Sequence, residues 1–215
     1  ATGVAQGTKA AAEEGYAFKY WTNEAGEIVG WDAKYVPAKV GGLNIEATYT
    51  AHFGIDDNGD NIPDEYQKTI TYKVVNGKWN DGTEADKTET VTLRDAEGHY
   101  SENGTANLAN IPRAGEQPDT GYEAGSWDET PTEKTVISKD SKTTFTYTYT
   151  EKGNVTITYV AETGGSVDPT SESLAPATGV AAGSTAVAEE GYAFKYWTNE
   201  GGEIVGWDAK YVPAK

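Results

Sequence analysis

The sequence predicts a mostly β protein made of several small domains in tandem. The 25 glycines and 14 tyrosines, with a hydrophobic content of only 37 %, indicate many short strands joined by tight turns. Segments such as Thr143–Thr150 alternate threonine with aromatic residues, which is the period of a strand. Ala1–Lys39 also returns as Ala177–Lys215, with 34 of 39 positions identical at a constant offset of 176 residues. This duplication indicates that domains, rather than single strands, are repeated.

The length of the repeat sets the expected organisation. A solenoid repeat has a period of roughly 20 to 50 residues, whereas a period of 176 residues holds one or two domains. We therefore expect a type A module around each copy of the duplication and a type B module between them. The ten residues Gly15–Glu24 return unchanged as Gly191–Glu200, and no difference between the copies touches an aromatic residue.

Four parts are expected along the chain. They are a partial type A module at 1–53, an acidic linker at 54–67, a type B module at 68–152 and a partial type A module at 153–215. The segment Val40–Phe53 follows the first copy alone, and Asn154–Val160 precedes the second copy alone. The first partial module is therefore expected to lack an opening strand and the second a closing strand, within a longer array. Unpaired strand edges of this kind are sticky.

Within type A, two strands are predicted. Tyr16, Phe18 and Tyr20 alternate with smaller or charged residues, and a bulge or a strand end at Tyr20–Trp21 would return Trp21 to the core face. Asn44–Phe53 alternates cleanly, which predicts a closing strand with one buried and one solvated face. We interpret Trp21 and Trp197, with the nearby tyrosines and phenylalanines, as core rather than as a sugar platform, because small β domains bury their large aromatics.

Type B has its own strand signals. A strand over Thr69–Val75 followed by Asn-Gly predicts a hairpin with a type I′ turn. Thr88–Leu93 is a further strand, and Thr143–Thr150 is expected to close the domain. Gly121–Trp127 has the Gly-Tyr-x4-Trp spacing of the duplicated stretch, which indicates that type B is a diverged relative of type A.

Charge and composition exclude several functions. Lys and Arg number 17 against 34 Asp and Glu, so a net charge of -17 would repel a phosphate backbone, and no nucleic-acid partner is expected. Cysteine is absent, which excludes disulfides and thiolate zinc sites. No apolar run is long enough to span a bilayer, so no membrane contact is expected of this segment. His99 lies near Asp95 and Ser101 but without a nucleophile elbow, so it is interpreted as a loop histidine in a protein that is not an enzyme.

The acidic linker is the candidate metal site. Oxygen donors at positions 1, 3, 5, 7 and 9 of an EF-hand-like loop would come from Asp56, Asn58, Asp60, the Ile62 carbonyl and Asp64. The loop departs from the EF-hand pattern at Asn61, in place of the turn glycine, and at Gln67, in place of the bidentate glutamate. Two interpretations stay open, a calcium site that fixes the angle between domains and a plain solvated linker.

Two further tryptophans are candidate ligand contacts. Trp31 and Trp207 are flanked by glycine and aspartate in an expected loop, so their side chains could be exposed to a glycan or a protein.

Several type A segments together resemble the divergent internalin B-repeat family of bacterial surface proteins. They are the Gly-Gly turn at 164–169, the small-residue strand at 183–188, Gly-Tyr-Ala-Phe-Lys-Tyr-Trp-Thr at 191–198 and, in the first copy, the strand at 45–53. The resemblance implies small β-grasp-like modules in an elongated array, within an extracellular, cell-wall-attached adhesin of the Gram-positive kind. Tyr20 and Tyr196 depart from the pattern, since a glycine often precedes the tryptophan, and the family pattern carries no catalytic residue.

Three functions follow as hypotheses. The leading one is a non-enzymatic stalk or fibre whose partners are neighbouring repeats of the same protein. The second is a module that binds host glycan or extracellular protein through exposed aromatics. The third is a filament that assembles by exchange of strands between chains.

Overall fold

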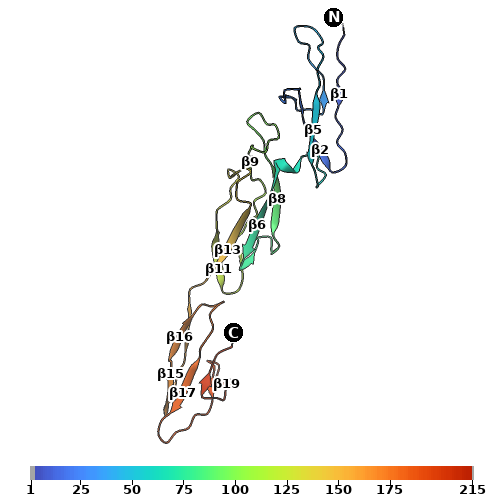
Figure 1. Ribbon diagram of the computed structural model, residues 1–215. Helices are drawn as coiled ribbons and strands as arrows, with labels where there is room; N and C mark the ends of the chain where they lie inside the picture. The colour runs from blue at the N-terminus through green and yellow to red at the C-terminus, as the bar shows by residue number, and fades with distance from the viewer. Residues whose placement is uncertain (1–2, 215) are drawn as a thin grey trace. The chain divides into compact units, whose positions relative to one another are not determined.

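The computed structural model describes residues 3–214 (Figure 1). The mostly β prediction is confirmed, because these residues form strands β1–β20 and a single 3-10 turn, η1. They divide into two compact units, one comprising residues up to Lys73, Ala85–Arg113 and Trp127–Tyr147, the other Val74–Glu84, Ala114–Ser126 and Thr148 onward. All five points at which the chain passes from one unit to the other fall inside the expected type B module, so the division at residues 53, 67 and 152 stays a prediction from the repeats. Among residues 3–214, no helix is both long and apolar enough to cross a membrane.

The first copy of the duplication and the strand that follows it form two small sheets in the first unit. Strand β2 (Tyr16–Thr22) lies between β3 (Ile28–Gly30) and β5 (Thr50–Ile55), while β1 (Thr8–Lys9) pairs with β4 (Lys34–Tyr35). The pairing of β2 with β5 is antiparallel, with Ala17 opposite Gly54 and Trp21 opposite Ala51. Ala17 and Trp21 are 2 % and 5 % exposed and form the centre of this small core.

Two details of the predicted type A strands are wrong. The register of β2 shifts between Phe18 and Tyr20 against β5, and between Trp21 and Thr22 against β3, rather than at Tyr20–Trp21. Trp21 nevertheless reaches the core. The closing strand begins at Thr50 instead of Asn44, because Thr50 pairs with Thr22, the last residue of β2. Residues 44–49 therefore extend past the end of their partner and stay largely exposed.

A four-stranded sheet forms the centre of the chain. Its order is β11 (Tyr122–Trp127), β13 (Thr144–Glu151), β6 (Gln67–Val75) and β8 (Lys87–Thr92). The predicted strands at 88–93 and 143–150 are confirmed to within a residue, although β13 is an inner strand. The side chains of Ile70, Tyr72 and Phe145 are at most 1 % exposed. A short pair, β9 (Ala106–Asn107) with β12 (Val136–Ile137), lies in the same unit.

The predicted hairpin after Val75 is wrong. Asn76 does turn the chain with φ 62°, but β7 (Gly77–Lys78) pairs with β10 (Gln117–Pro118) and not with β6. Gly77 serves close packing instead of a type I′ turn, since a Cβ there would lie 2.5 Å from both the Gln117 carbonyl and the Tyr149 ring. The hydroxyl of Tyr149 donates to the Lys78 carbonyl at 2.8 Å, which fixes this corner of the second unit.

In the second unit, strands β14 (Val155–Thr158), β15 (Gly165–Asp168) and β16 (Ser171–Leu174) precede the second copy of the duplication. The second copy itself forms β17 (Ser184–Ala188), β18 (Trp197–Thr198), β19 (Ile204–Gly206) and β20 (Lys210–Tyr211). Strand β14 pairs with β16, β17 lies between β15 and β20, and β18 pairs with β19. Residues 192–196 lie outside any strand, although the same sequence forms most of β2. The sequence of β5, the partner of β2, occurs once in the 215 residues, after the first copy.

The tryptophan cores of the two copies are nevertheless alike, as predicted. The indole N–H of Trp21 donates to the Asp32 carbonyl at 3.1 Å, and that of Trp197 donates to the Asp208 carbonyl at 3.1 Å. Each indole also stacks on a tyrosine with ring centroids 5.8 Å apart. Trp197 is 8 % exposed. Tyr16 and Tyr192 do not join these cores, because they are 49 % and 58 % exposed.

Candidate functional site

The acidic linker folds into a tight loop around one carboxylate. Asp56 is 5 % exposed, and its carboxylate accepts the backbone N–H groups of Gly59 at 2.8 Å, Asp60 at 3.1 Å and Asn61 at 2.9 Å. Asn61 has φ 65°, so it occupies the left-handed conformation that a glycine would supply in an EF-hand loop. Asn61, which departs from the EF-hand pattern, thus takes the backbone conformation of the glycine that it replaces.

A second carboxylate closes the loop onto the strand that follows. Asp60 accepts the N–H of Ile62 at 2.9 Å and the side-chain amide of Gln67 at 2.6 Å. These hydrogen bonds, the one from Gln67 above all, hold the pKa of the Asp60 carboxyl below its ordinary value. The other end of the Gln67 amide accepts from Asn58 at 3.1 Å. Gln67 thus takes part in the loop at the position where an EF-hand has its glutamate.

The five predicted metal donors share this loop, but their side chains bind the loop itself. Asp64 accepts the N–H of Asp57 at 3.1 Å, and the Asn58 side-chain oxygen accepts the N–H of Asp60 at 2.9 Å. Within residues 3–214 there is no group of three or more His, Cys, Asp or Glu side chains placed to hold a metal ion. The donor set is all oxygen, which suits a hard cation such as calcium.

The loop leads into η1 (Asp64–Tyr66), a short 3-10 turn that directly follows Pro63. Pro63 packs on β5, since a Cβ on Gly54 would lie 2.8 Å from the proline ring. The ammonium of Lys19, on β2, forms an ion pair with Glu65 and lies 5.6 Å from the centre of the Tyr66 ring. Burial, and then the neighbouring Glu65, raises the pKa of the Tyr66 phenol. The first copy is thus fastened to the start of β6 by one cation and one aromatic ring.

A loop after β8 (Lys87–Thr92) contributes a further contact with the first copy. Its backbone turns at Asp95–Gly98, and the Asp95 carboxylate accepts the N–H of His99 at 2.8 Å and lies 3.4 Å from its ring nitrogen. The guanidinium of Arg94 donates to the Gly98 carbonyl at 2.7 Å and covers the ring of Tyr100 at 4.3 Å. The hydrogen bonds described among residues 3–214 join His99 to Asp95 and do not bring the Ser101 hydroxyl to that pair. These contacts within the loop therefore hold the His99 imidazole in one orientation.

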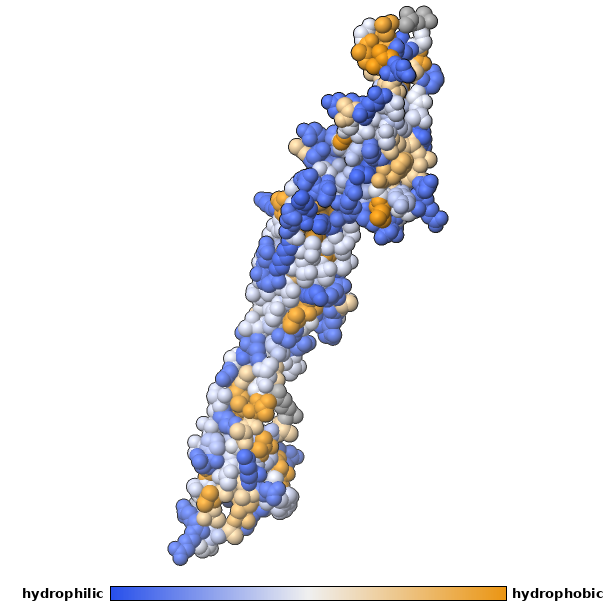
Figure 2. All heavy atoms as spheres, viewed as in Figure 1, coloured by the Kyte–Doolittle hydropathy of each residue, from blue (hydrophilic) through white to orange (hydrophobic). Residues whose placement is uncertain are grey.

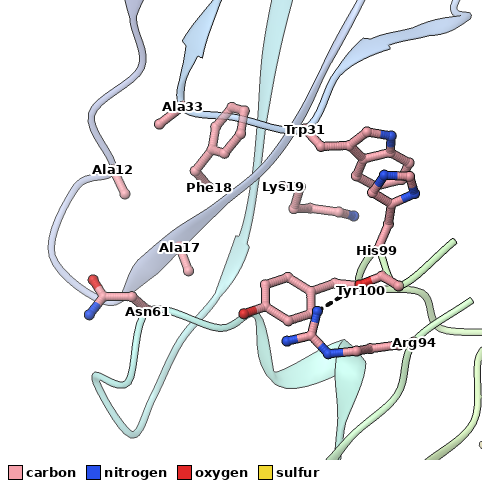
Figure 3. Close-up of a pocket in the computed structure, with 11 residues that line it drawn as sticks. Ala12, Ala17, Phe18, Lys19, Trp31, Ala33, Asn61, Arg94, His99 and Tyr100 are labelled. Carbon is pink, nitrogen blue, oxygen red and sulfur yellow. Dashed lines mark hydrogen bonds between the residues drawn. The ribbon is translucent and has the colours of Figure 1, made fainter.

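That imidazole lies flat against Trp31 (Figure 3). The two ring centroids are 4.3 Å apart and the planes differ by 6°. Tyr20 meets the same indole edge to face at 5.7 Å. Beside the stacked pair is an open cleft of about 490 Å³, whose lining includes Phe18, Lys19 and Arg94. We name the contacts of Lys19 and Trp31 with Glu65, Tyr66 and His99 the joint.

The two tryptophans predicted as ligand contacts differ in their surroundings. Trp31 is half-buried because His99 covers one face of its ring. Trp207 keeps the edge contact, with Tyr196 at 5.7 Å, but is 69 % exposed. The sequence held no signal for the pairing with His99, because this residue lies 68 positions downstream in a loop without strand pattern.

A further set of contacts, which the sequence analysis did not predict, lies in the second unit. The carboxylate of Glu151, at the end of β13, accepts the backbone N–H groups of Ala177 and Thr178 at 2.7 Å each and the Thr178 hydroxyl at 2.8 Å. Further along, Glu172 accepts the hydroxyl of Tyr159 at 2.7 Å. This bond lowers the pKa of the Glu172 carboxyl, while burial and then the same carboxylate raise the pKa of Tyr159 to about 12. Carboxylates therefore hold the start of the second copy in place.

Residues 155–213 match the divergent InlB B-repeat domain. The match covers β14 to β20 and most of the second copy of the duplication, in agreement with the resemblance found in the sequence. No curated protein and no solved structure gives a significant match to the chain.

Proposed function

From the match of residues 155–213 to a repeat module of surface proteins, we propose that the chain is a non-enzymatic segment of a bacterial cell-surface adhesin. In this role it is a stalk or fibre that carries a binding domain away from the cell wall. The 176-residue offset between two nearly identical copies supports this proposal, since a stalk is lengthened by repeating whole modules. We further propose that each complete type A module has a β-grasp-like fold and is extracellular.

The joint is the observation that carries the stalk proposal. A spacer must resist bending, and a linker stiffens only where neighbouring modules contact each other. Here Lys19 pairs with Glu65, and Trp31 stacks on His99, so two contacts from different elements fix the first copy to the sheet that follows. The short linker between them is itself folded around Asp56.

Calcium is proposed as a stiffener of the same linker. The ion would take Asp56, Asn58, Asp60, the Ile62 carbonyl and Asp64 as ligands. The hard oxygen donors at alternate positions and the left-handed Asn61 support this proposal. Bound calcium would offset two of the three carboxylate charges and hold the loop against the start of β6. It would not take part in any reaction.

Melting curves with calcium and with a chelator test the metal. We expect calcium to raise the melting temperature, and Asp60→Ala to abolish the rise. Asp57→Ala is the matched control, because Asp57 is exposed and is not among the proposed ligands. A rise that survives in Asp60→Ala, or no rise in the unaltered chain, would remove calcium from the proposal.

Binding to a panel of glycans and extracellular matrix proteins tests the stalk itself. A stalk is expected to bind no member of the panel. The second candidate function is recognition through an exposed aromatic, which the 69 % exposed indole of Trp207 favours. Under that alternative, one panel member would bind and Trp207→Ala would abolish binding, and this result would overturn the stalk as the main role.

A further inference from the structure

The open cleft beside the stacked rings of Trp31 and His99 has a volume of about 490 Å³, which is within the range of sites for small organic molecules. The residues that line it belong to the first compact unit. They come from β2 and the segments around it, from Asn61 of the linker and from the loop at 94–100. A molecule in the cleft would therefore contact the first copy and the loop after β8 at once.

One wall of the cleft is apolar. It is formed by Ala12, Ala17, Ala33 and the ring of Phe18. Figure 3 shows Ala12, Ala33 and Phe18 on one side of the cleft, across from Arg94. Ala12 is exposed, and Phe18 and Ala33 are half-buried, so this wall keeps apolar surface in contact with water. A hydrocarbon group that covered this surface would bind by the hydrophobic effect.

The opposite wall carries a cation that is available for a ligand. The ammonium of Lys19 is paired with Glu65, and the imidazole of His99 lies beside Asp95. Arg94 is exposed and forms no ion pair within residues 3–214. One N–H of its guanidinium donates to the Gly98 carbonyl, and the group covers the ring of Tyr100. The other N–H groups are suited to a carboxylate, which a guanidinium binds in a bidentate manner.

The cleft differs in charge from the rest of the chain. Hydrophilic side chains are spread over the face of the molecule shown in Figure 2, and 34 Asp and Glu residues give the chain a net charge of -17. None of the described residues that line the cleft is Asp or Glu, whereas Lys19 and Arg94 are among them. An anionic molecule is repelled by an acidic surface. The cleft therefore offers such a molecule a cation in a lining without carboxylates.

We propose that the cleft binds an apolar organic acid, with its carboxylate on the Arg94 guanidinium and its hydrocarbon body on the alanines and Phe18. Two kinds of molecule share this chemistry, a fatty acid with a flexible chain and a sterol acid with a rigid ring system. Because the ligand touches β2 and the loop after β8, it adds a bridge to the joint. This binding goes beyond the stalk role and depends on the cleft alone.

Titrations of the unaltered chain with octanoate and with cholate test the proposal, with NMR shifts of the backbone amides as the readout. For at least one acid we expect a dissociation constant below about 2 mM and shifts concentrated in residues 17–19 and 94–100. Binding of octanoate alone identifies a flexible chain as the ligand, and binding of cholate alone identifies a rigid ring system. Octan-1-ol has the hydrocarbon of octanoate without its charge, so at the same concentration it should cause little or no shift.

Three results of these titrations overturn the proposal. They are no binding of either acid up to about 10 mM, shifts that lie outside both groups of residues, and shifts by octan-1-ol as large as those by octanoate. These outcomes are separate from the binding panel for the stalk, which contains glycans and matrix proteins and neither of the two acids.

Charge variants test the role of Arg94. Arg94→Gln should weaken binding of the acid at least about tenfold, because the carboxylate loses its cation. Arg94→Lys keeps the charge and should retain most of the affinity. Arg113→Gln is the matched control, since Arg113 is exposed and does not line the cleft. Full affinity in Arg94→Gln, or an equal loss in Arg113→Gln, overturns the assignment of the carboxylate to Arg94.

A larger side chain on the apolar wall tests where the hydrocarbon lies. Ala12 is exposed, so Ala12→Trp leaves the core unchanged and places an indole in the space of the ligand. We expect this variant to weaken binding at least about tenfold. Ala188 is the same position of the second copy, is also exposed and does not line the cleft, so Ala188→Trp is the matched control. Equal affinity of the two variants overturns the placement of the hydrocarbon.

Discussion

Removal of the Trp31 indole should loosen the joint, while the same change at Trp207 should have little effect. Both indoles meet a tyrosine edge to face at 5.7 Å, and their local sequences are identical. Trp31 in addition stacks on His99 at 4.3 Å, whereas Trp207 is 69 % exposed. The two positions therefore differ chiefly in the presence of the His99 loop.

The size of the effect follows from the difference in burial. The buried fraction of Trp31 is larger than that of Trp207 by at least about a third of the residue surface, which is roughly 80 Å² of about 250 Å². At about 25 cal/mol per Å², this burial contributes about 2 kcal/mol. A stacked aromatic pair adds about 0.5–1.5 kcal/mol. Trp31→Ala should lower the free energy of opening the joint by about 2.5–3.5 kcal/mol, and Trp207→Ala should cost less than about 0.5 kcal/mol.

Hydrogen exchange measured by mass spectrometry is the suitable assay, because a chain of several modules need not unfold in one step. About 3 kcal/mol corresponds to roughly 100-fold faster exchange, expected in β2 and in residues 94–100 of Trp31→Ala. Exchange in the equivalent stretch of Trp207→Ala should be nearly unchanged. Equal effects of the two substitutions would refute the assignment of the stack as a stabilising joint.

Three further predictions concern the cores and the carboxylates. Glu89 is 8 % exposed and accepts the hydroxyl of fully buried Tyr72 and two backbone N–H groups, so Glu89→Ala should lower the urea midpoint by an amount equivalent to about 3–5 kcal/mol, and Tyr72→Phe by about 1 kcal/mol. Gly77→Ala should cost about 1–3 kcal/mol in the same assay, because its Cβ would lie 2.5 Å from an aromatic ring, and a neutral result would contradict this packing. The Glu172 pKa is lowered in the folded state by the Tyr159 hydroxyl, so its contribution to stability is present above the ordinary value of 4.5 and is lost as pH falls below it. Thermal melts should therefore show a smaller acid-induced drop in Glu172→Gln than in the unaltered chain.

Features that depend on local pattern were predicted well. The strands at 87–92 and 144–151 follow from period-two alternation, which survives in the structure because one face of each is covered. The strand at 16–22 forms as well, but Ala17 is buried there and Tyr16 is exposed. The burial of Trp21 and Trp197 follows from the size of the side chain.

Features that depend on a distant partner were not predicted. The alternation of residues 44–49 was not sufficient to form a strand, because their partner β2 ends opposite Thr50. The Asn-Gly pair after Val75 suggested a hairpin, but the segment 117–118 took the place of β6 as partner of β7. Pattern specifies which face a residue prefers, and long-range pairing decides whether a strand forms there.

The candidate site shows the same difference between local contacts and contacts with distant partners. The contacts of Asp56 in the linker are local, because all its partners lie within five residues, although the sequence analysis assigned this carboxylate to a metal ion rather than to the backbone. The contact of Trp31 with His99 could not be predicted, since it depends on how a loop after β8 is held by Asp95. Neither partner has a local sequence that marks it.

The closure of the tryptophan cores has a consequence for synthesis of the chain. Each indole N–H finds its carbonyl acceptors 11 and 12 residues further on, whereas the contact of Thr22 with His52 in β5 spans 30 residues. A chain that emerges from a ribosome or a translocation pore N-terminus first can close the short indole loop early. The sheet must wait until the later strand has emerged. Each module of this kind can therefore remain incompletely folded while the chain is being synthesised or exported. Its sheet forms only after the later strand has emerged.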